Sequence, residues 1–184
     1  MNWQAGVEVP ERSSLGYRIS DEECKWYALY TCPRHEKVVQ KQLTLRAFEA
    51  YLPLYRSLRR WNDRKAWIDL PLFPGYLFVR VSLRARARVL AVPGVVHVVS
   101  FRGQPASLSE EEIQSIQISV AARAAEPYPY LAKGKCIQIA AGPFRGLKGI
   151  VVRRKGRLRA VISIHSIMQS FAVEVDAADV RPAT

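Results

Sequence analysis

The sequence predicts an α+β fold, in which a mostly antiparallel sheet flanked by helices is followed by a small all-β barrel. Three observations lead to this prediction. Up to residue 125, short β-rich runs alternate with amphipathic helical patterns. The two prolines of Glu126-Pro127-Tyr128-Pro129-Tyr130 then interrupt both periodicities. Beyond them every predicted element is short and rich in β-branched residues, which fits a small barrel.

The same observations divide the chain into four parts. Residues 1–23 are mixed polar and end in the acidic cluster Asp21-Glu22-Glu23, which predicts a flexible leader. Residues 24–125 form the first predicted domain, residues 126–132 a linker, and residues 133–182 the barrel.

The positive charge of the chain lies in the predicted folded parts. The 184 residues carry a formal net charge of +12. Residues 1–24 have two basic and five acidic side chains, residues 25–125 sixteen and seven, and residues 126–184 ten and four. We therefore expect the protein to work beside a polyanion such as nucleic acid, the alternative being a basic surface that serves only solubility.

Composition predicts a soluble, cytoplasmic protein. Hydrophobic residues make up 49% of the chain and charged residues 24%, which is typical of globular proteins. No apolar run approaches the ~20 residues of a membrane span, and the N-terminus lacks the apolar segment of a signal peptide. Cys24, Cys32 and Cys136 fit no zinc spacing, which favours reduced thiols.

Strands and helices alternate in the first predicted domain. Val39 and Leu43 begin an apolar stripe that continues at helical spacing to Ala47 and Ala50, while Leu45 and Phe48 lie off it. This predicts a helix that is buried on more than one side. The elements expected are strand 25–31, helix 34–50, strand 51–55 interrupted by Pro53, a basic hairpin tip at 56–65, strand 66–70, strand 76–81, helix 83–92, strand 95–99, a turn at 102–105 and a helix after Ser109.

Two later elements have specific local signals. The run Val95–Val99 is almost entirely β-branched and predicts a buried strand in which His97 is a structural residue. Ser109 and Glu112 have the spacing of a capping box, and Leu108 and Ile113 that of a hydrophobic staple. The strands expected in the barrel are 136–139, 149–152, 158–164 and 171–175.

The chain is organised around the stretch Pro71–Val79, where a Pro-Gly turn leads into the strand at 76–81. A period of two places Leu77, Val79 and Val81 on one aliphatic face. The opposite face carries Tyr76 and Phe78. An aromatic strand face of this kind suits docking of another protein, and the alternative is burial of both faces between two layers.

The sequence contains no recognisable catalytic motif. His35, His97 and His165 are isolated, and none has a cysteine or carboxylate partner at the spacing of a metal site or a catalytic triad. No P-loop, GxGxxG or GxSxG occurs. We therefore expect a protein that is not an enzyme, needs no cofactor or metal, and acts by binding.

Several motifs taken together resemble a known family. Four motifs occur in the order in which the NGN domain of NusG-type transcription factors has them. They are Trp26-Tyr27, Arg34-His35-Glu36-Lys37, Tyr51-Leu52-Pro53 and Phe73-Pro74-Gly75-Tyr76. The segment from Lys133-Gly134-Lys135 through residues 142–149 resembles a KOW domain. The form of residues 71–76 and the basic hairpin are most similar to the specialised paralogues RfaH and UpxY.

The resemblance implies a function in transcription. Such factors dock the NGN domain on the clamp helices of the largest RNA polymerase subunits and bridge the DNA cleft, which suppresses pausing and favours elongation. Carried over to this chain, the polymerase contact comprises Phe73, Pro74 and Tyr76, with Tyr51 and Phe78 beside them. The second contact, across the cleft, falls on Arg84, Arg86 and Arg88, where RfaH has a His-Thr-Thr sequence.

The resemblance also implies contacts with nucleic acid and with a partner of the barrel. Upstream or non-template DNA would meet Arg34, Lys37, Arg59, Arg60 and Arg64. In NusG the KOW domain recruits Rho or a ribosomal protein through an aromatic-Gly-Arg loop; this chain has Ile167-Met168-Gln169, which lacks the arginine.

Two functions are therefore compared. The leading hypothesis is a monomeric antitermination factor bound to RNA polymerase. The alternative is a KOW-type RNA-binding module that acts on structured RNA or the ribosome, and it predicts tight RNA binding without polymerase.

Overall fold

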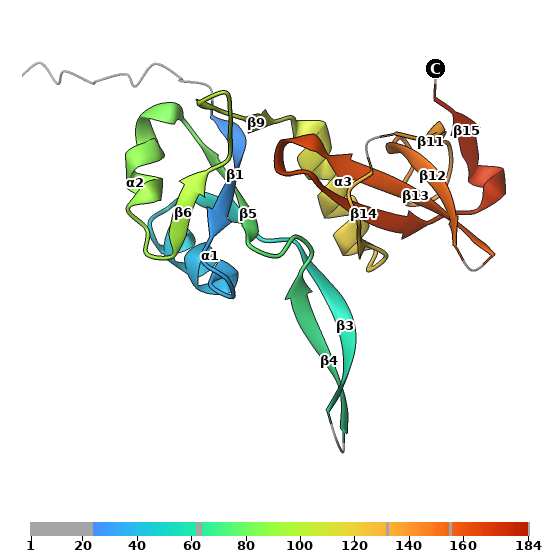
Figure 1. The fold of residues 1–184 in the computed structure, drawn as a ribbon, viewed down its shortest axis with the longest axis horizontal. Coiled ribbons are helices and arrows are strands. Elements are labelled where there is room, and N and C mark those ends of the chain that lie inside the picture. The colour runs from blue at the N-terminus through green and yellow to red at the C-terminus, as the bar shows by residue number, and fades with distance from the viewer. Residues whose placement is uncertain (1–23, 62–63, 132, 155, 184) are drawn as a thin grey trace, which may run out of the picture.

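The computed structural model describes residues 24–61, 64–131, 133–154 and 156–183 (Figure 1). The predicted leader and the predicted Asn62-Asp63 turn lie outside the described residues. The described chain combines few helices with many antiparallel strands, which confirms the predicted α+β class.

The first sheet is antiparallel and has the strand order β2-β5-β1-β6, with β9 paired to another part of β1. Its central pair joins β1 to β5, where Leu29 lies opposite Leu77. The predicted strands 25–31 and 76–81 are confirmed at their predicted bounds. The strands of this sheet are β1 (Lys25–Thr31), β2 (Glu49–Tyr51), β5 (Tyr76–Val81), β6 (Val95–Val98) and β9 (Ser107–Leu108).

Two helices pack on one face of this sheet. They are α1 (Glu36–Leu45) and α2 (Arg86–Leu90), and a 3-10 turn at Leu83–Ala85 leads into α2. Val39 of α1 and Val89 of α2 are buried in one apolar core with the aliphatic face of β5.

α1 ends at Leu45 rather than near Ala50, so the predicted helix is too long. Ala47 has a φ of +60°, and the chain then pairs with β5 as strand β2. Leu45 is 77% exposed, which contradicts the prediction that this helix is buried on more than one side. The free edge of β5 supplies backbone partners that a helix cannot use, and strand pairing therefore replaces the last predicted turns.

β6 is an edge strand rather than the predicted buried strand. It pairs only with β1 among the described strands, and Val96 and His97 are exposed. The His97 ring lies 5.2 Å from the Tyr30 ring, centroid to centroid. β-branched composition thus predicted a strand correctly, but not its place in the sheet.

The basic segment forms a hairpin that projects from the body of the molecule (Figure 1). Its strands are β3 (Leu54–Trp61) and β4 (Arg64–Pro71). The predicted strand 51–55 is divided at Leu52-Pro53, because the backbone N–H of Leu72 donates to the carbonyl of Pro53 at 2.8 Å and turns the chain out of the first sheet.

The C-terminal sheet has six antiparallel strands in the order β10-β14-β13-β12-β11-β15. The four predicted barrel strands correspond to β11, β12, β13 and β14. The strands are β10 (Glu126–Tyr128), β11 (Cys136–Ile139), β12 (Lys148–Arg154), β13 (Arg157–Ile164), β14 (Gln169–Glu174) and β15 (Val180–Pro182).

Part of the segment 126–132, expected to be a linker, is instead a strand. Glu126–Tyr128 pairs with β14, and Pro127 lies opposite Phe171. β10 is the last strand on its side of the sheet, and an edge position is where a strand tolerates proline. The prolines were therefore a misleading signal for an unstructured connection.

α3 (Glu110–Ala121) connects the two sheets in sequence, and its predicted start is confirmed. The Ser109 hydroxyl accepts from the backbone N–H of Glu112 at 3.2 Å, and the Glu112 carboxylate accepts from the backbone N–H of Ser109 at 2.9 Å. Leu108 and Ile113, the predicted staple, are both buried. This capping box fixes where α3 begins.

The turn before β5 is held from two sides. Gly75 has a φ of +81°, and a Cβ added there would lie 3.1 Å from the Tyr30 ring. Its N–H donates to the buried Glu36 carboxylate at 2.8 Å, and its carbonyl accepts from the backbone N–H of Thr31 at 2.8 Å. α1 and β1 thereby fix Phe73 and the start of β5.

We predict that Glu36→Ala lowers the free energy of unfolding by about 1–3 kcal/mol, because it leaves the buried Gly75 N–H without an acceptor. Urea denaturation measures this loss. Glu36→Gln is the matched control: it keeps an oxygen at the acceptor position and should lose less. Equal stability of the wild type and Glu36→Ala would contradict a role for this bond in holding the turn.

Candidate functional site

The two faces of β5 lie in two different cores, as the period of two predicts. Leu77, Val79 and Val81 belong to the core with α1 and α2. Phe78 belongs to the other core, together with Phe73 from the preceding turn. A single strand therefore separates the helix-covered side of the sheet from an aromatic side.

The aromatic side is a cluster of rings. The Phe73 ring lies edge-on to Phe78, with centroids 6.0 Å apart, and Tyr51 stacks beside Phe78 at 6.4 Å. Tyr76 lies 5.2 Å from Tyr30. Phe73 and Phe78 are fully buried, Tyr51 and Tyr76 are half-buried, and Pro74 is exposed. We call Tyr51, Phe73, Pro74, Tyr76 and Phe78 the aromatic face.

The C-terminal sheet covers the aromatic face. The Phe73 ring contacts that of Phe171 in β14, with centroids 6.1 Å apart. One continuous apolar core runs from Phe78, past Ile116 of α3, to Ile162 of β13. In this arrangement both faces of β5 are buried, which is the alternative to an open docking face.

The contact between the two sheets is apolar. Among the described residues, every side-chain hydrogen bond and ion pair has both partners before residue 126 or both after residue 125. Ring and aliphatic contacts therefore hold the C-terminal sheet on the aromatic face.

Tyr51 has an unusual environment on the aromatic face. Its hydroxyl is buried and has no hydrogen-bond partner among the described residues. Burial raises the pKa of Tyr51 to about 12. Burial also raises the pKa of Tyr76, with a smaller contribution from the neighbouring Tyr30. A buried hydroxyl without a partner destabilises this closed arrangement.

The second predicted contact lies on the opposite side of the first sheet. Arg84, Arg86 and Arg88 are exposed on the 3-10 turn and α2, which pack on the helix-covered face. The Arg88 guanidinium lies 5.1 Å from the centre of the Phe48 ring. The structure therefore separates these arginines from the aromatic face by the thickness of the sheet.

The structure brings only some of the residues predicted to bind nucleic acid close to one another. Lys37 of α1 donates through Nζ to the Asp69 carbonyl of β4 at 2.9 Å, which joins the helix to the base of the hairpin. Arg34 is exposed at the turn before α1. Arg59 and Arg60 are exposed, and as neighbours on β3 they point to opposite faces of the hairpin. The Arg64 side chain lies outside what the structure describes.

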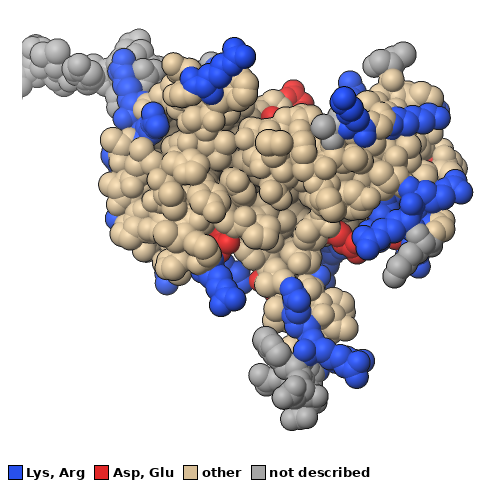
Figure 2. Space-filling view, viewed as in Figure 1, with Lys and Arg blue, Asp and Glu red and all other residues tan. Residues whose placement is uncertain are grey.

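Figure 2 shows lysine and arginine side chains on the hairpin and over the C-terminal sheet, where few acidic side chains accompany them. Basic side chains therefore lie on the projecting hairpin as well as on the body of the molecule. A surface of this kind binds polyanions in a salt-dependent way.

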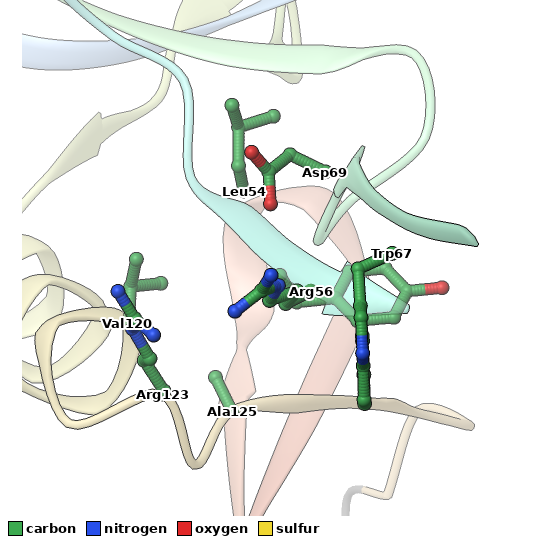
Figure 3. A pocket seen from close by; sticks show the side chains of 8 residues that line it. Leu54, Arg56, Trp67, Asp69, Val120, Arg123 and Ala125 are labelled. Atoms are coloured by element: carbon green, nitrogen blue, oxygen red, sulfur yellow. The ribbon is translucent and has the colours of Figure 1, made fainter. Parts of the chain in front are cut away.

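A cleft at the base of the hairpin was not predicted. It has a volume of about 430 Å³ and lies between the hairpin and the end of α3 (Figure 3). We call it the hairpin cleft. The cluster of arginines around an aromatic at 56–67 gave a sequence signal for one wall, but no pattern pointed to Arg123. The cleft is lined by Leu54, Tyr55, Arg56, Trp67, Asp69, Val120, Arg123 and Ala125.

The predicted partner loop of the barrel presents less apolar surface than expected. Ile167 is buried at the end of a 3-10 turn, His165–Ile167. Met168 has a φ of +49° and is 63% exposed, and Gln169 begins β14 half-buried. Met168 is therefore the apolar residue of this loop that can meet a partner without a change in the core.

The described residues contain no group of histidine, cysteine and carboxylate side chains that could hold a metal ion. No helix in the described part of the chain is long and apolar enough to cross a membrane.

Comparison with known proteins identifies relatives along most of the chain. The family model described as "Transcription termination factor nusG" matches residues 24–117. "Transcription termination/antitermination protein NusG" of Rickettsia bellii is 22% identical over 154 residues, covering 76% of this chain and 81% of that protein. The protein of the same name from Deinococcus radiodurans is 28% identical over 155 residues, covering 69% and 82%.

A solved structure shares the fold. The structure titled "Domain interaction in Thermotoga maritima NusG" superposes with a TM-score of 0.55 at 22% sequence identity. The match covers 88% of this chain and 98% of that one.

We predict that Tyr51→Phe stabilises the free protein, by up to about 1 kcal/mol at neutral pH, because it removes a buried hydroxyl without a partner. The gain should grow above pH 10. The folded protein keeps the Tyr51 proton up to a pKa of about 12, whereas the unfolded chain releases it near 10.0, so the wild type loses stability between these values. Urea denaturation at pH 7 and pH 11 measures both effects, and a stability difference that is constant with pH would contradict the second.

Proposed function

The chain belongs to the NusG family of transcription factors, which are not enzymes, and we propose that it is an elongation factor that binds RNA polymerase and suppresses pausing and termination. We further propose that it is a specialised antiterminator of the RfaH and UpxY kind. The form of residues 71–76 and the basic hairpin support this assignment.

The proposed protein has two domains that separate when it acts. The first comprises residues 24–125 and the second residues 133–182, and the connection between them is shortened because β10 belongs to the second sheet. The observation that carries the proposal is the aromatic face, which is covered by apolar contacts alone. Between described residues this cover includes no side-chain hydrogen bond or ion pair from one sheet to the other, so another apolar surface can replace it without leaving buried polar groups unpaired.

The polymerase clamp helices are the proposed replacement for the C-terminal sheet. Phe73 and Phe78 would supply the apolar anchor, with Tyr76 and Pro74 at its edge. Tyr51 supports this role, because its buried hydroxyl lacks a hydrogen-bond partner among the described residues and can donate to a polar group of the clamp. The protein would thus be closed when free and open when bound.

The remaining charged surfaces fit a protein that bridges a cleft. Arg84, Arg86 and Arg88 lie on the side of the sheet opposite the aromatic face, as a second polymerase contact requires. Arg34 and Lys37, together with Arg59, Arg60 and Arg64 of the hairpin, are the proposed contacts to upstream or non-template DNA. Met168 is the proposed partner contact of the second domain, next to Gln169 and the buried Ile167.

We predict that a double variant of the aromatic face and a single variant of the C-terminal sheet have opposite effects on polymerase binding. Phe73→Ala with Tyr76→Ala removes the proposed anchor and should reduce retention of the protein on immobilised core polymerase about 10-fold or more. Phe171→Ala weakens the closed contact from the other side without touching the proposed anchor, and it should raise retention. A pull-down with equal amounts of folded protein measures both.

Far-UV circular dichroism establishes that each variant is folded before it is compared. Unchanged retention of the Phe73/Tyr76 variant would remove the aromatic face as the polymerase contact. A wild type that binds structured RNA tightly but not polymerase would favour the RNA-binding module instead.

We predict that the wild-type protein shortens the dwell time of polymerase on a template with a defined pause, and that the Phe73/Tyr76 variant does not. The reason is that a factor bridging the cleft holds the polymerase in its elongating state. A run-through assay with purified components measures the effect. If the wild type binds polymerase but lengthens the pause, the antitermination function is wrong although the contact stands.

A further inference from the structure

The hairpin cleft brings two arginines together from distant parts of the chain. Arg56 comes from β3, and Arg123 from the end of α3. Neither forms an ion pair with a carboxylate of the described residues, although Asp69 is the cross-strand neighbour of Arg56. Figure 3 shows the Arg56 guanidinium directed toward the side of the cleft where Arg123 and Val120 lie. The cleft is therefore prepared for an anion.

Arg123 occupies a position that usually takes glycine. It follows the last turn of α3 with a φ of +53°, which is in the left-handed region. Glycine adopts this conformation without strain, and an arginine there is unfavourable for the fold. Strained residues of this kind are concentrated at binding sites.

Arg56 lies beside an exposed aromatic ring. Its guanidinium lies 5.1 Å from the centre of the Trp67 ring, and Trp67 is itself 57% exposed. In Figure 3 the guanidinium stands between the Trp67 ring and the side of the cleft where Arg123 lies. Trp67 thus lies on one side of the guanidinium, and the cleft with Arg123 lies on the other. Nucleic-acid bases stack on aromatic rings and on guanidinium planes in this way.

The outer part of the same hairpin face also carries apolar and cationic side chains. Leu58 lies opposite Trp67, and Arg60 lies opposite Lys65. Two cations directly opposite each other destabilise a hairpin in the absence of a counter-anion. Along this face the pairs are therefore Arg56 with Asp69, the apolar pair Leu58 with Trp67, and the cationic pair Arg60 with Lys65. Cationic and aromatic side chains on one exposed face are typical of surfaces that follow a single strand of nucleic acid.

We propose that the hairpin cleft binds one nucleotide of a single-stranded nucleic acid. Its base stacks on the open face of the Arg56 guanidinium, which Trp67 positions, and its phosphate lies against Arg123. This inference rests on the proposed nucleic-acid role of the hairpin and adds base stacking to its phosphate contacts.

An acidic side chain of a protein partner fits the cleft less well. A volume of about 430 Å³ is in the range of small-molecule sites and exceeds what one carboxylate side chain fills. Asp69, which also lines the cleft, can accept a hydrogen bond from the amino group of a base, and a carboxylate side chain has no such donor.

Fluorescence anisotropy with three short labelled oligonucleotides tests the proposal. The probes are a single-stranded DNA, the RNA of the same sequence, and the DNA with abasic sites at its central positions. We expect the wild type to bind the intact DNA about 5- to 30-fold more tightly than the abasic DNA. DNA and RNA should bind alike if the cleft contacts only base and phosphate, and tighter RNA binding would assign the ligand to the transcript.

The decisive variant is Arg56→Lys, which keeps the charge and removes the planar group. It should bind intact and abasic DNA with nearly equal affinity, and Trp67→Ala should behave in the same way. Arg102→Lys is the matched control, because Arg102 lies 5.3 Å from the centre of the Phe101 ring on an exposed turn outside the cleft. This control should keep the full preference for intact DNA.

Two results would overturn the proposal. If Arg56→Lys keeps the preference for intact DNA, the base does not stack on the guanidinium. If the wild type binds abasic and intact DNA equally, the hairpin contacts phosphate alone. Both results leave polymerase retention unaffected, so they are distinguishable from a failure of the proposed function.

Discussion

A strand that is apolar on both faces is stable only between two layers, and β5 is such a strand. α1 and α2 cover Leu77 and Val79, and the C-terminal sheet covers Phe73 and Phe78. Each fully buried side chain of this size contributes about 1.5–3 kcal/mol relative to exposure. Most of the architecture follows from this requirement, because the turn at Gly75, the path of α3 and the position of the second sheet all serve to close the aromatic side.

The two layers that cover β5 are held by different kinds of contact, and they therefore differ in how easily they can be removed. α1 is tied to the turn before β5 by the bond between Glu36 and Gly75, which is buried and charge-assisted. The C-terminal sheet meets the aromatic face through rings and aliphatic side chains, and the hydroxyl of Tyr51 has no hydrogen-bond partner among the residues that the structure describes. A cover with polar anchors is costly to remove, whereas an apolar cover can be replaced by any surface of similar shape. This difference supports a protein that exposes one face of β5 and keeps the other closed.

Binding of nucleic acid and binding of protein use separate surfaces in this proposal. The hairpin projects from the body and carries exposed cations, while the aromatic face is buried until the two sheets part. The hairpin cleft is formed by the hairpin and the end of α3, so it is already present in the closed arrangement. Contacts with nucleic acid can therefore precede the contact with polymerase, and electrostatic attraction acts over a longer range than apolar packing.

The sequence by itself determined the α+β class, most strand positions, the start of α3 and the alternation along β5, because periodicity and capping depend on residues close together in the chain. Local patterns predicted too long a helix for α1, a buried strand for β6 and a linker for the segment that contains β10. These predictions were wrong because strand partners and edge positions depend on distant segments. Only the tertiary structure decided what covers Phe73 and that Arg56 and Arg123 line the same cleft, since both depend on contacts between segments far apart in the sequence.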